Sequence, residues 1–474
     1  MMRNLEMLTD LYEFSMAGGF HHDLPQTRGV FDIFYRDVPD KGSFVLAAGL
    51  AQVVDVLRDF HFSAADIDYL RSLKLYDEDF LQYLANLKLD CTVSAVPEGT
   101  PVFPREPLMT VEGPLDQAQL LETVLLNILN HQSLIATKAR RITFAAAGRP
   151  VMEFGARRAQ GPDSAIYGTR AAIIGGAGST SNVLAAKMFG IPAAGTMAHS
   201  WVEAYPSELD AFRAWAKHYP DNAALLVDTY DVLNSGVPNA ISVFKELRAA
   251  GHKPVGIRID SGDIARLAKA ARRMLDAAGF QDVKITASNA LDENVIPALL
   301  AQGAPLDNFG IGEKMITSSS SPVLSGVYKL AATRTNGVLK PKIKVSASIE
   351  KTTLPGIKQT YRLYTPGTHE AFADVIALAD EQLEAPLAVV NSNPLLTSKR
   401  IVLKEFDAEP LAAPVPLDQP APSDVFEIQR YAKGKLSELP IETQRLVNPD
   451  TYTVYVTQKL ADLQQQLVDE AKQD

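Results

Sequence analysis

From residue 149 onward, short apolar runs alternate with helical patterns along the chain. Each run is followed by small or polar residues, and then by a segment whose apolar positions recur with the spacing of one helix face. The runs are PVMEFGARRA, IPAAGTMAHS, ALLVDTYD, PVGIRIDSGD, VKITASNALD and LDNFGIGEKM. They follow one another at intervals of roughly 20–30 residues, which is about one strand plus one crossover helix. The pattern therefore predicts six parallel strands connected by helices.

The helical segments between these strands are amphipathic. In the clearest one, DIARLAKAARRMLDAAG, the apolar face consists of Ile264, Leu267, Ala271 and Leu275, and the helix is expected to end at Gly279. Six such units predict an α/β fold with a parallel sheet, and an irregular α/β barrel is the preferred form. A doubly wound open sheet is the alternative architecture.

The segments on either side lack this rhythm. Residues 1–148 mix helices with short strands, including an apolar helix that starts near Asp116 and a second helix over LIATKARRITFAAAG. Beyond the barrel, the stretch LKPKIKVSASIEKTTLPGIKQTYRLYT is typical of short strands. The Pro-rich stretch 409–422 is typical of a tether, and VTQKLADLQQQLVDEAKQD is typical of a helix. We expect an N-terminal α+β domain at 1–148, the barrel at 149–340, and a small C-terminal region at 341–474 that packs on the N-terminal domain.

Length and composition are those of an ordinary multidomain globular protein. The chain has 474 residues, of which 46% are hydrophobic and 22% charged. The net charge of −10 argues against a broad basic face for nucleic acid, but not against a local cationic cleft for an anionic small molecule. We expect neither a membrane span nor a signal peptide. With Cys91 as the only cysteine, disulfides and cysteine-based zinc sites are excluded, and a cytoplasmic location is expected.

Polar side chains follow the predicted strands at the points where the strands end. In an α/β barrel the carboxyl ends of the strands form the active-site face, so these side chains are expected to meet there. Any one of them alone is explained as well by a helix cap or a satisfied core polar group, but six at successive strand ends predict a functional site. These six residues are His199, Asp228, Arg258, Asp260, Ser288 and Asn289.

Three loops add groups that suit phosphate. EFGARRAQG places Arg157 and Arg158 after a strand, where guanidinium groups make bidentate phosphate contacts, although a surface ion pair is the alternative interpretation. IIGGAGSTSN is a Gly-rich turn that is expected to open a helix, and NFGIGEKM brings Gly310 and Gly312 after a late strand. Glycine and serine are also common at ordinary helix starts. The sequence contains no motif of Walker ATPases, zinc proteases or G-x-S-x-G hydrolases.

Six stretches together resemble the nicotinate phosphoribosyltransferase family. They are LTDLYEFSMAGGF, FGARRAQGPDSA, GGAGSTSNVLAAKMFGIPAAGTMAHSW, LLVDTYDVLNSGVPNAI, GIRIDSGD and SGVYKLAA, and the likeness continues through EKTTLPGIKQTYRLY to LVNPDTYTVYVTQKL. The resemblance implies the condensation of nicotinate with phosphoribosyl diphosphate to nicotinate mononucleotide and diphosphate, as the first step of NAD salvage, coupled to ATP hydrolysis with Mg²⁺. It also implies a type II phosphoribosyltransferase barrel with an N-terminal domain, and a homodimer whose active site lies near the subunit interface.

The resemblance also assigns roles to individual residues. His199 matches a histidine that ATP phosphorylates transiently, and a carboxylate holding the ring suits that role, with Asp228 as the expected partner and Glu203 as the alternative. Asp260 is expected to act in catalysis on the ribose hydroxyls or through Mg²⁺, whose ligands stay unassigned. The remaining site residues form two groups. Nicotinate is expected to contact Tyr12, Phe154, Thr196 and Arg258, and phosphoribosyl diphosphate to contact Arg157, Ser288, Gly310, Gly312 and Thr353.

Two other functions stay open on the sequence: the related nicotinamide phosphoribosyltransferase, and a non-catalytic barrel that binds phosphoribosyl metabolites. The absence of an acidic residue between Gly175 and Asn182 favours the acid substrate, because a carboxylate there would repel nicotinate. A non-catalytic barrel predicts erosion of the site, but the polar residues at the strand ends are all present. Glu313 and Ser325 stand where many family members have a small hydroxyl residue and a glycine, so the phosphate contacts of this loop are left unassigned.

Overall fold

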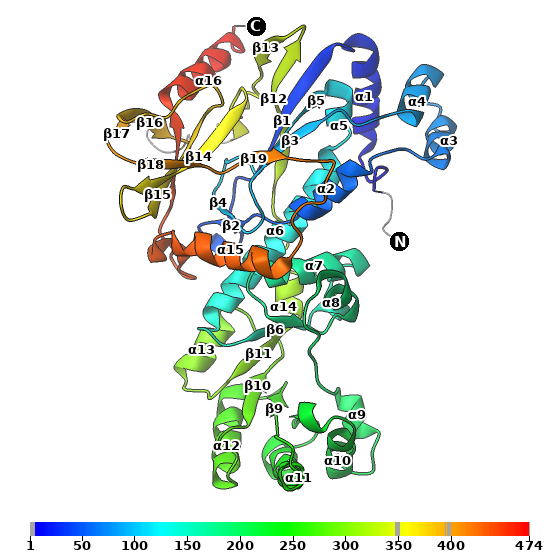
Figure 1. Ribbon diagram of the computed structural model, residues 1–474, viewed down its shortest axis with the longest axis vertical. Helices are drawn as coiled ribbons and strands as arrows, with labels where there is room; N and C mark the ends of the chain where they lie inside the picture. Colours follow the sequence, from blue (N-terminus) through cyan, green and yellow to red (C-terminus); the bar gives the residue numbers. More distant parts are fainter. Residues whose placement is uncertain (1–4, 347–350, 394, 396–399, 474) are drawn as a thin grey trace. The chain divides into compact units, whose positions relative to one another are not determined.

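The chain folds into two compact units of mixed helices and strands (Figure 1). The computed structural model describes residues 5–346, 351–393, 395 and 400–473. Unit 1 comprises Met1–Leu134, Val323–Ser423 and Arg430–Asp474, and unit 2 comprises Ile135–Pro322 and Asp424–Gln429. Part of the predicted strand region, residues 347–350, lies outside the described residues. The three-part division of the chain expected from the sequence stays a prediction.

Unit 2 contains a six-stranded parallel sheet. Its strands are β6 (Val151–Glu153), β7 (Ser179–Thr180), β8 (Ala224–Leu226), β9 (Gly256–Ile259), β10 (Lys284–Ala287) and β11 (Asn308–Ile311). In space they follow the order β7-β6-β11-β10-β9-β8. The last strand along the chain, β11, pairs with the first, β6, as in a closed barrel. The two edge strands, β7 and β8, are not paired with each other, and we call this opening the seam. The sheet is therefore the predicted irregular α/β barrel, which is confirmed.

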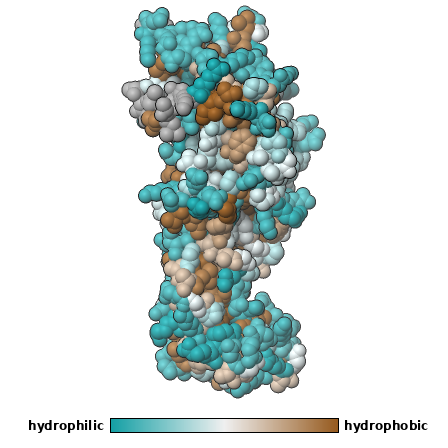
Figure 2. Space-filling view, turned by 90° about the vertical axis from the view of Figure 1, so that its left-hand side faces the viewer, coloured by the Kyte–Doolittle hydropathy of each residue, from teal (hydrophilic) through white to brown (hydrophobic). Residues whose placement is uncertain are grey.

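Helices connect these strands. They are α7 (Pro162–Ile174), α8 (Val183–Phe189), α9 (His199–Glu203), α10 (Glu208–His218), α11 (Val237–Ala249), α12 (Ile264–Ala277), α13 (Val295–Ala301) and α14 (Glu313–Ile316). In α12 the predicted apolar face is buried, and the side chain of Asp263 accepts a hydrogen bond from the N–H of Arg266, which caps the helix start. Figure 2 shows mostly hydrophilic side chains over the lower end of this unit, in the region of α12.

One sequence prediction for unit 2 is wrong. IPAAGTMAHS is not a strand: Ala193 makes only an isolated β-bridge with Thr180, and His199 begins helix α9. The Gly-rich stretch IIGGAGSTSN does precede a helix, since its last residue, Asn182, caps α8, but its glycines follow the end of α7 and the short strand β7 lies between. A Cβ on Gly175 would lie 2.3 Å from the carbonyl oxygen of Ala136. Close packing of the backbone therefore requires glycine at this position.

Unit 1 contains two six-stranded sheets and a two-stranded ribbon. The first sheet has the order β13-β12-β1-β5-β3-β19 and consists of β1 (Thr27–Phe34), β3 (Thr92–Ala95), β5 (Met109–Pro114), β12 (Val327–Thr335), β13 (Val338–Pro341) and β19 (Ala413–Val415). The second has the order β17-β16-β20-β15-β14-β18 and consists of β14 (Lys358–Thr365), β15 (Glu370–Leu378), β16 (Leu387–Asn391), β17 (Ile401–Leu403), β18 (Asp407–Pro410) and β20 (Thr453–Thr457). The ribbon pairs β2 (Val45–Leu46) with β4 (Pro101–Val102).

The Pro-rich stretch 409–422 is not a featureless tether, so that prediction is wrong. Its first residues belong to β18 and β19, which pair with β14 and β3. Both are edge strands, where a proline removes no ladder hydrogen bond that a neighbour needs.

Unit 1 also contains helices along most of its length. They are α1 (Leu11–Asp23), α2 (Leu50–Arg58), α3 (Ala64–Ser72), α4 (Glu78–Ala85), α5 (Leu115–Gln119), α15 (Val425–Ser437) and α16 (Gln458–Glu470), with α6 (Glu122–Ala145) and α15 shared with unit 2. The predicted C-terminal helix is confirmed. The two helices predicted after Asp116 differ from the structure, because one 24-residue helix, α6, covers most of both.

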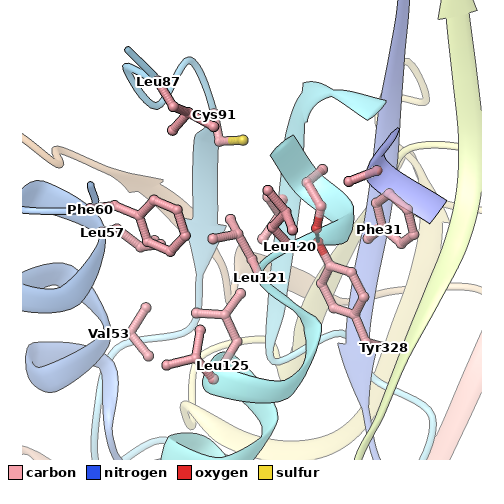
Figure 3. Close-up of a cluster of buried hydrophobic side chains, with 14 of the residues drawn as sticks. Phe31, Val53, Leu57, Phe60, Leu87, Cys91, Leu120, Leu121, Leu125 and Tyr328 are labelled. Atoms are coloured by element: carbon pink, nitrogen blue, oxygen red, sulfur yellow. Dashed lines mark hydrogen bonds between the residues drawn. The ribbon is translucent and has the colours of Figure 1, made fainter. Parts of the chain in front are cut away.

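A cluster of buried hydrophobic side chains forms the core of unit 1 (Figure 3). The rings of Phe31 and Tyr328 stack with their centroids 4.6 Å apart, and the Tyr328 hydroxyl donates to the carbonyl of Ala118 at 2.7 Å. Cys91 lies in this cluster, and burial raises the pKa of its thiol to about 12, so the reactive thiolate is scarce at neutral pH. None of the helices in the described residues combines the length and apolar character needed to cross a bilayer.

A glycine next to the barrel gives a stability prediction. A Cβ on Gly236 would lie 1.9 Å from the backbone carbonyl oxygen of Val227, so no side-chain rotation relieves the clash. We expect Gly236→Ala to lower the free energy of unfolding of unit 2 by about 3 kcal/mol. In the control Gly178→Ala, nothing lies within 4 Å of the new Cβ, and the change should stay below about 0.5 kcal/mol. Because Trp201 and Trp215 both lie in unit 2, tryptophan fluorescence during urea unfolding measures the difference, and equal midpoints would contradict it.

Candidate active site

A cavity of about 560 Å³ opens at the carboxyl ends of the strands of unit 2. Its volume is typical of small-molecule sites, which span roughly 300–1,000 Å³. Most of the residues predicted for the site line this cavity. They are Phe154, Arg157, Thr196, His199, Arg258, Asp260, Ser288, Gly310 and Gly312. The barrel thus brings together side chains from five separate stretches of the chain.

The guanidinium of Arg258 is the centre of the hydrogen bonds in this cavity. Its Nε donates to Ser288 Oγ at 2.8 Å, its Nη1 to Thr196 Oγ1 at 3.1 Å, and its Nη2 to Asp260 Oδ1 at 2.8 Å. The Ser288 hydroxyl also donates to Asp260 Oδ1. These contacts fix the guanidinium, whose carbon lies 5.7 Å from the centroid of the Phe154 ring.

His199 has other partners than the sequence predicts. Its Nδ1 lies 3.1 Å from the hydroxyl of Thr229, and its Nε2 lies 3.9 Å from Asp260 Oδ2. Asp228, the expected partner of the ring, instead accepts hydrogen bonds from the N–H of Asp260 at 2.8 Å and from the hydroxyl of Ser261 at 2.6 Å. The structure therefore does not bring Asp228 to the His199 ring, because hydrogen bonds from the end of the next strand occupy its Oδ2.

Asp228 and Asp260 form a neighbouring pair of carboxylates. Asp228 is buried, and its Oδ1 has no hydrogen-bond partner among the residues that the structure describes. Asp260 lines the cavity, and its Oδ2 faces His199 at 3.9 Å. Carboxylate oxygens are the ligands of hard cations, so this pair fits a Mg²⁺ ion.

Two residues shape the wall around Phe154. A Cβ on Gly310 would lie 2.6 Å from the edge of the Phe154 ring, so Gly310 makes room for that ring. Glu153, the last residue of β6, is buried and was missed by the sequence analysis. Its carboxylate accepts hydrogen bonds from the N–H of Gly155 and from the hydroxyls of Thr169 (3.0 Å) and Thr180 (2.6 Å). It thereby fixes the turn that carries Phe154, and the signal was a charged residue inside an apolar run.

The rim of the cavity carries positive charge. Arg157 and Arg158 are exposed, and Arg158 lies 3.8 Å from Glu313. Arg157 has no ion-pair partner within the described ranges of the chain, so its guanidinium is available to an anionic ligand. On the same wall, Asn289 has a φ of 103°, a left-handed conformation that is rare outside glycine and that concentrates at functional sites.

Thr229 and Ser261 are further residues that the sequence analysis missed. Both are hydroxyl residues directly after the strand-end acids of VDTYD and RIDSGD, and this adjacency is the signal that would have found them. Two predicted site residues belong to unit 1. Tyr12 lies in the first turn of α1 and is 45% exposed, and Thr353 is buried with its hydroxyl accepting from the N–H of Lys344 at 3.0 Å. Their roles stay predictions.

Comparison with known families covers most of the chain. The model of the nicotinate phosphoribosyltransferase (NAPRTase) N-terminal domain matches residues 7–130, the NAPRTase family model matches 150–375, and the model of the C-terminal domain matches 357–464. The nicotinate phosphoribosyltransferase of Bacillus subtilis is 41% identical over 474 residues, which cover 99% of this chain and 96% of that protein. The nicotinate phosphoribosyltransferase of Homo sapiens is 34% identical, with 96% of this chain and 95% of that protein covered.

A solved structure gives the same result for the fold. The crystal structure of human nicotinic acid phosphoribosyltransferase has a TM-score of 0.85 and 32% sequence identity to this chain, covering 97% of this chain and 99% of that one. The barrel, with the parts that precede and follow it, has the type II phosphoribosyltransferase fold. The cavity at its strand ends occupies the face where such barrels carry their active sites. The chain belongs to the nicotinate phosphoribosyltransferase family.

Glu153 gives a prediction for the pH dependence of stability. Burial raises the pKa of this carboxyl above its ordinary value of 4.5. Below that value the carboxyl is protonated in the folded and the unfolded chain alike, whereas above it the unfolded chain ionises first. The stability that Glu153 contributes is therefore lost as the pH rises through the folded pKa. We expect the free energy of unfolding of the wild type to fall relative to Glu153→Gln as the pH rises above 4.5.

Urea unfolding followed by tryptophan fluorescence measures this difference for unit 2. The two proteins are compared at each pH, so that the other titrating groups cancel. Parallel pH profiles of the wild type and Glu153→Gln would contradict the assignment of a raised pKa to this carboxyl.

Proposed function

We propose that this chain is an enzyme that joins nicotinate to phosphoribosyl diphosphate, releasing nicotinate mononucleotide and diphosphate, and so begins NAD salvage from nicotinate. The observation that carries the proposal is the fixed guanidinium of Arg258 beside the Phe154 ring, in a cavity of a chain from this family. A flat aromatic acid needs a ring to stack on and a cation for its carboxylate, and this wall offers both.

The hydrogen-bonding capacity of Arg258 supports nicotinate as the ligand. A guanidinium carries five N–H groups, and three of them already donate to Ser288, Thr196 and Asp260. One N–H on each terminal nitrogen remains to donate to the substrate carboxylate. The neutral amide of nicotinamide would gain less from this cation. Tyr12 as the cover of the other ring face rests on the resemblance alone.

For phosphoribosyl diphosphate we propose Arg157 at the rim, Ser288, and the backbone of Gly310 and Gly312. The exposed guanidinium of Arg157 and the glycine turn on the same wall support this assignment, whereas Thr353 rests on the resemblance. A bound Mg²⁺ would neutralise diphosphate charge, and Asp228 and Asp260 are the carboxylates that would hold it. Transfer breaks the bond between ribose C1 and diphosphate, whose oxygen keeps the electron pair, while the pyridine nitrogen donates its pair to C1. The carboxylate of Asp260 stabilises the positive charge that develops on the ribose.

We further propose that ATP is a co-substrate and that it phosphorylates His199. The attacking ring nitrogen displaces ADP from the γ-phosphate, and water later releases phosphate from the ring. The Thr229 hydroxyl at Nδ1 and the Asp260 carboxylate near Nε2 support this role, because they fix the ring and stabilise its positive charge.

We propose a homodimer in the cytoplasm as the working form. One face of α1 and the turn before it exposes Leu8, Leu11, Tyr12 and Met16 by 40–55% each. An exposed apolar stripe of this kind is typical of a contact with another protein surface, here a second copy of the chain. The lone, buried Cys91 fits a reducing compartment.

The first prediction from the proposed function concerns Arg258. Arg258→Gln should raise the KM for nicotinate about 10- to 100-fold, because a charge-assisted contact to the carboxylate is lost. The KM of Arg258→Lys should lie between those of the wild type and Arg258→Gln, since an ammonium keeps the charge but cannot make the two-point contact of a guanidinium. Release of diphosphate is measured with nicotinate and with nicotinamide, and near-UV circular dichroism checks that each variant is folded. Turnover of nicotinamide but not of nicotinate by the wild type would refute the proposed substrate.

The second prediction concerns the coupling to ATP. His199→Ala should lose labelling by γ-labelled ATP and nicotinate-dependent ATP hydrolysis, yet retain ribosyl transfer, because transfer needs no covalent bond to the ring. Thr229→Val should slow labelling about tenfold by loosening the ring, whereas Thr229→Ser keeps the hydroxyl and should label normally. The label should survive base and be lost in acid. Acid-stable label, or undiminished labelling of His199→Ala, would overturn the assignment.

A further inference from the structure

Unit 1 holds a second group of ligand-type side chains, at the C-terminal end of α1, the opposite end of the helix from Tyr12, and at the start of α4. His21 and His22 lie in the last turn of α1, and Asp79 lies in the first turn of α4. Each of the three offers a ligand atom within 4.8 Å of those of the other two. We propose that these three side chains bind a divalent transition-metal ion, with Zn²⁺ as the best fit.

The distances approach those of tetrahedral coordination, and the ligand nitrogens of His21 and His22 lie within 4.8 Å of each other. His21 Nε2 lies 3.4 Å from Asp79 Oδ2, and His22 Nδ1 lies 4.0 Å from the same oxygen. Two ligands that are each about 2.0–2.1 Å from a tetrahedral zinc ion lie roughly 3.3 Å apart. The first pair already has this separation. The second needs only a small movement of Asp79, whose side chain is 78% exposed, and water completes the shell.

The second nitrogen of each imidazole faces another carboxylate. His22 Nε2 lies 2.8 Å from Asp77 Oδ2, and His21 Nδ1 lies 3.8 Å from Asp116 Oδ2. Metal-binding histidines usually have such a carboxylate on the nitrogen that does not bind the metal, because it sets the tautomer and raises the basicity of the ligand nitrogen. Asp77 is itself fixed, since its other oxygen accepts from the N–H of Phe80 at 2.9 Å.

Packing already orders one of the two rings. His21 stacks on Tyr83 with the ring centroids 4.3 Å apart and is 22% exposed. Little conformational entropy is then lost when this ring binds an ion. His22 is 41% exposed, so an ion can reach the group from solvent. Both rings also lie at the carboxyl end of α1, where the helix dipole favours a cation.

The donor set selects the class of ion. Two imidazole nitrogens with one carboxylate suit Zn²⁺ and its neighbours in the transition series, whereas Mg²⁺ and Ca²⁺ prefer all-oxygen shells. The carboxylates of Asp77 and Asp79 balance the charge of the ion. By joining the end of α1 to the start of α4, the ion would act as a clip within unit 1 and raise its resistance to unfolding.

Calorimetric titration of the full-length, chelator-treated protein with ZnCl₂, in millimolar MgCl₂, tests the proposal. We expect the wild type to show one saturable zinc site per chain that His22→Gln and Asp79→Asn each weaken at least about tenfold. His218→Gln is the matched control, because this exposed histidine lies at the end of α10 in unit 2, and it should bind zinc like the wild type. Cobalt(II) should give the intense visible absorption of a tetrahedral site in the wild type and not in His22→Gln.

Two results would overturn the proposal: a wild type without a saturable zinc component, or a component unchanged in His22→Gln and Asp79→Asn. Both substituted side chains are largely exposed, and thermal unfolding in the absence of metal should match the wild type. Zinc should raise the unfolding temperature of the wild type and not of His22→Gln. Zinc bound at His199 and Asp260 would persist in these variants, so the component that disappears belongs to α1 and α4. None of these readouts depends on transferase activity, so the zinc site and the proposed reaction stand or fall separately.

Discussion

The pairing of β11 with β6 is the constraint on which the active-site cavity depends. Ile311 lies opposite Glu153, so the last strand of the barrel is aligned with the first and Phe154 comes beside the glycine turn after β11. The next strands are registered in the same way, with Arg258 opposite Thr286. Because backbone hydrogen bonds set these alignments, Phe154, Arg258, Asp260 and Ser288 converge from distant parts of the sequence on rigid strand ends.

Once the strands are aligned, electrostatics decides how the side chains pair. A charge in a partly closed cavity is expensive unless it has a partner. Arg258 pairs with Asp260, and one oxygen of Asp228 accepts from the backbone N–H of Asp260. The same bonds orient the groups before a ligand arrives. What remains available is selective: the unused N–H groups of Arg258, the guanidinium of Arg157 and one buried oxygen of Asp228. These remaining hydrogen-bonding groups suit an anionic substrate and a cation better than a neutral ligand.

The sequence predicted the barrel and the polar residues at its strand ends because both follow from periodicity, whereas Phe154 and Thr196 came from the family resemblance. Strand ends are visible as a polar residue after an apolar run, so Asp260 and Ser288 could be placed without coordinates. The partner of His199 could not be predicted, because the direction of a side chain depends on neighbours from other strands, and Thr229 gives no periodic signal. The edge strands β18 and β19 were not predicted because their sequence is rich in proline, which is typical of a tether. An edge strand tolerates proline, so this composition does not exclude a strand.

The segment before His199 differs physically from the other strand ends. One isolated bridge, Ala193 to Thr180, joins it to the sheet, and a Cβ on Gly195 would meet nothing within 4 Å. Segments with few backbone hydrogen bonds and little packing open at lower free energy than sheet strands do. A group that accepts and then releases a phosphoryl group must tolerate a change of size and charge, which a rigid strand end would resist. With His199 in its proposed role as phosphoryl acceptor, the open seam of the barrel between β7 and β8 would supply that tolerance, while the paired strands hold Arg258 and Asp260 in place.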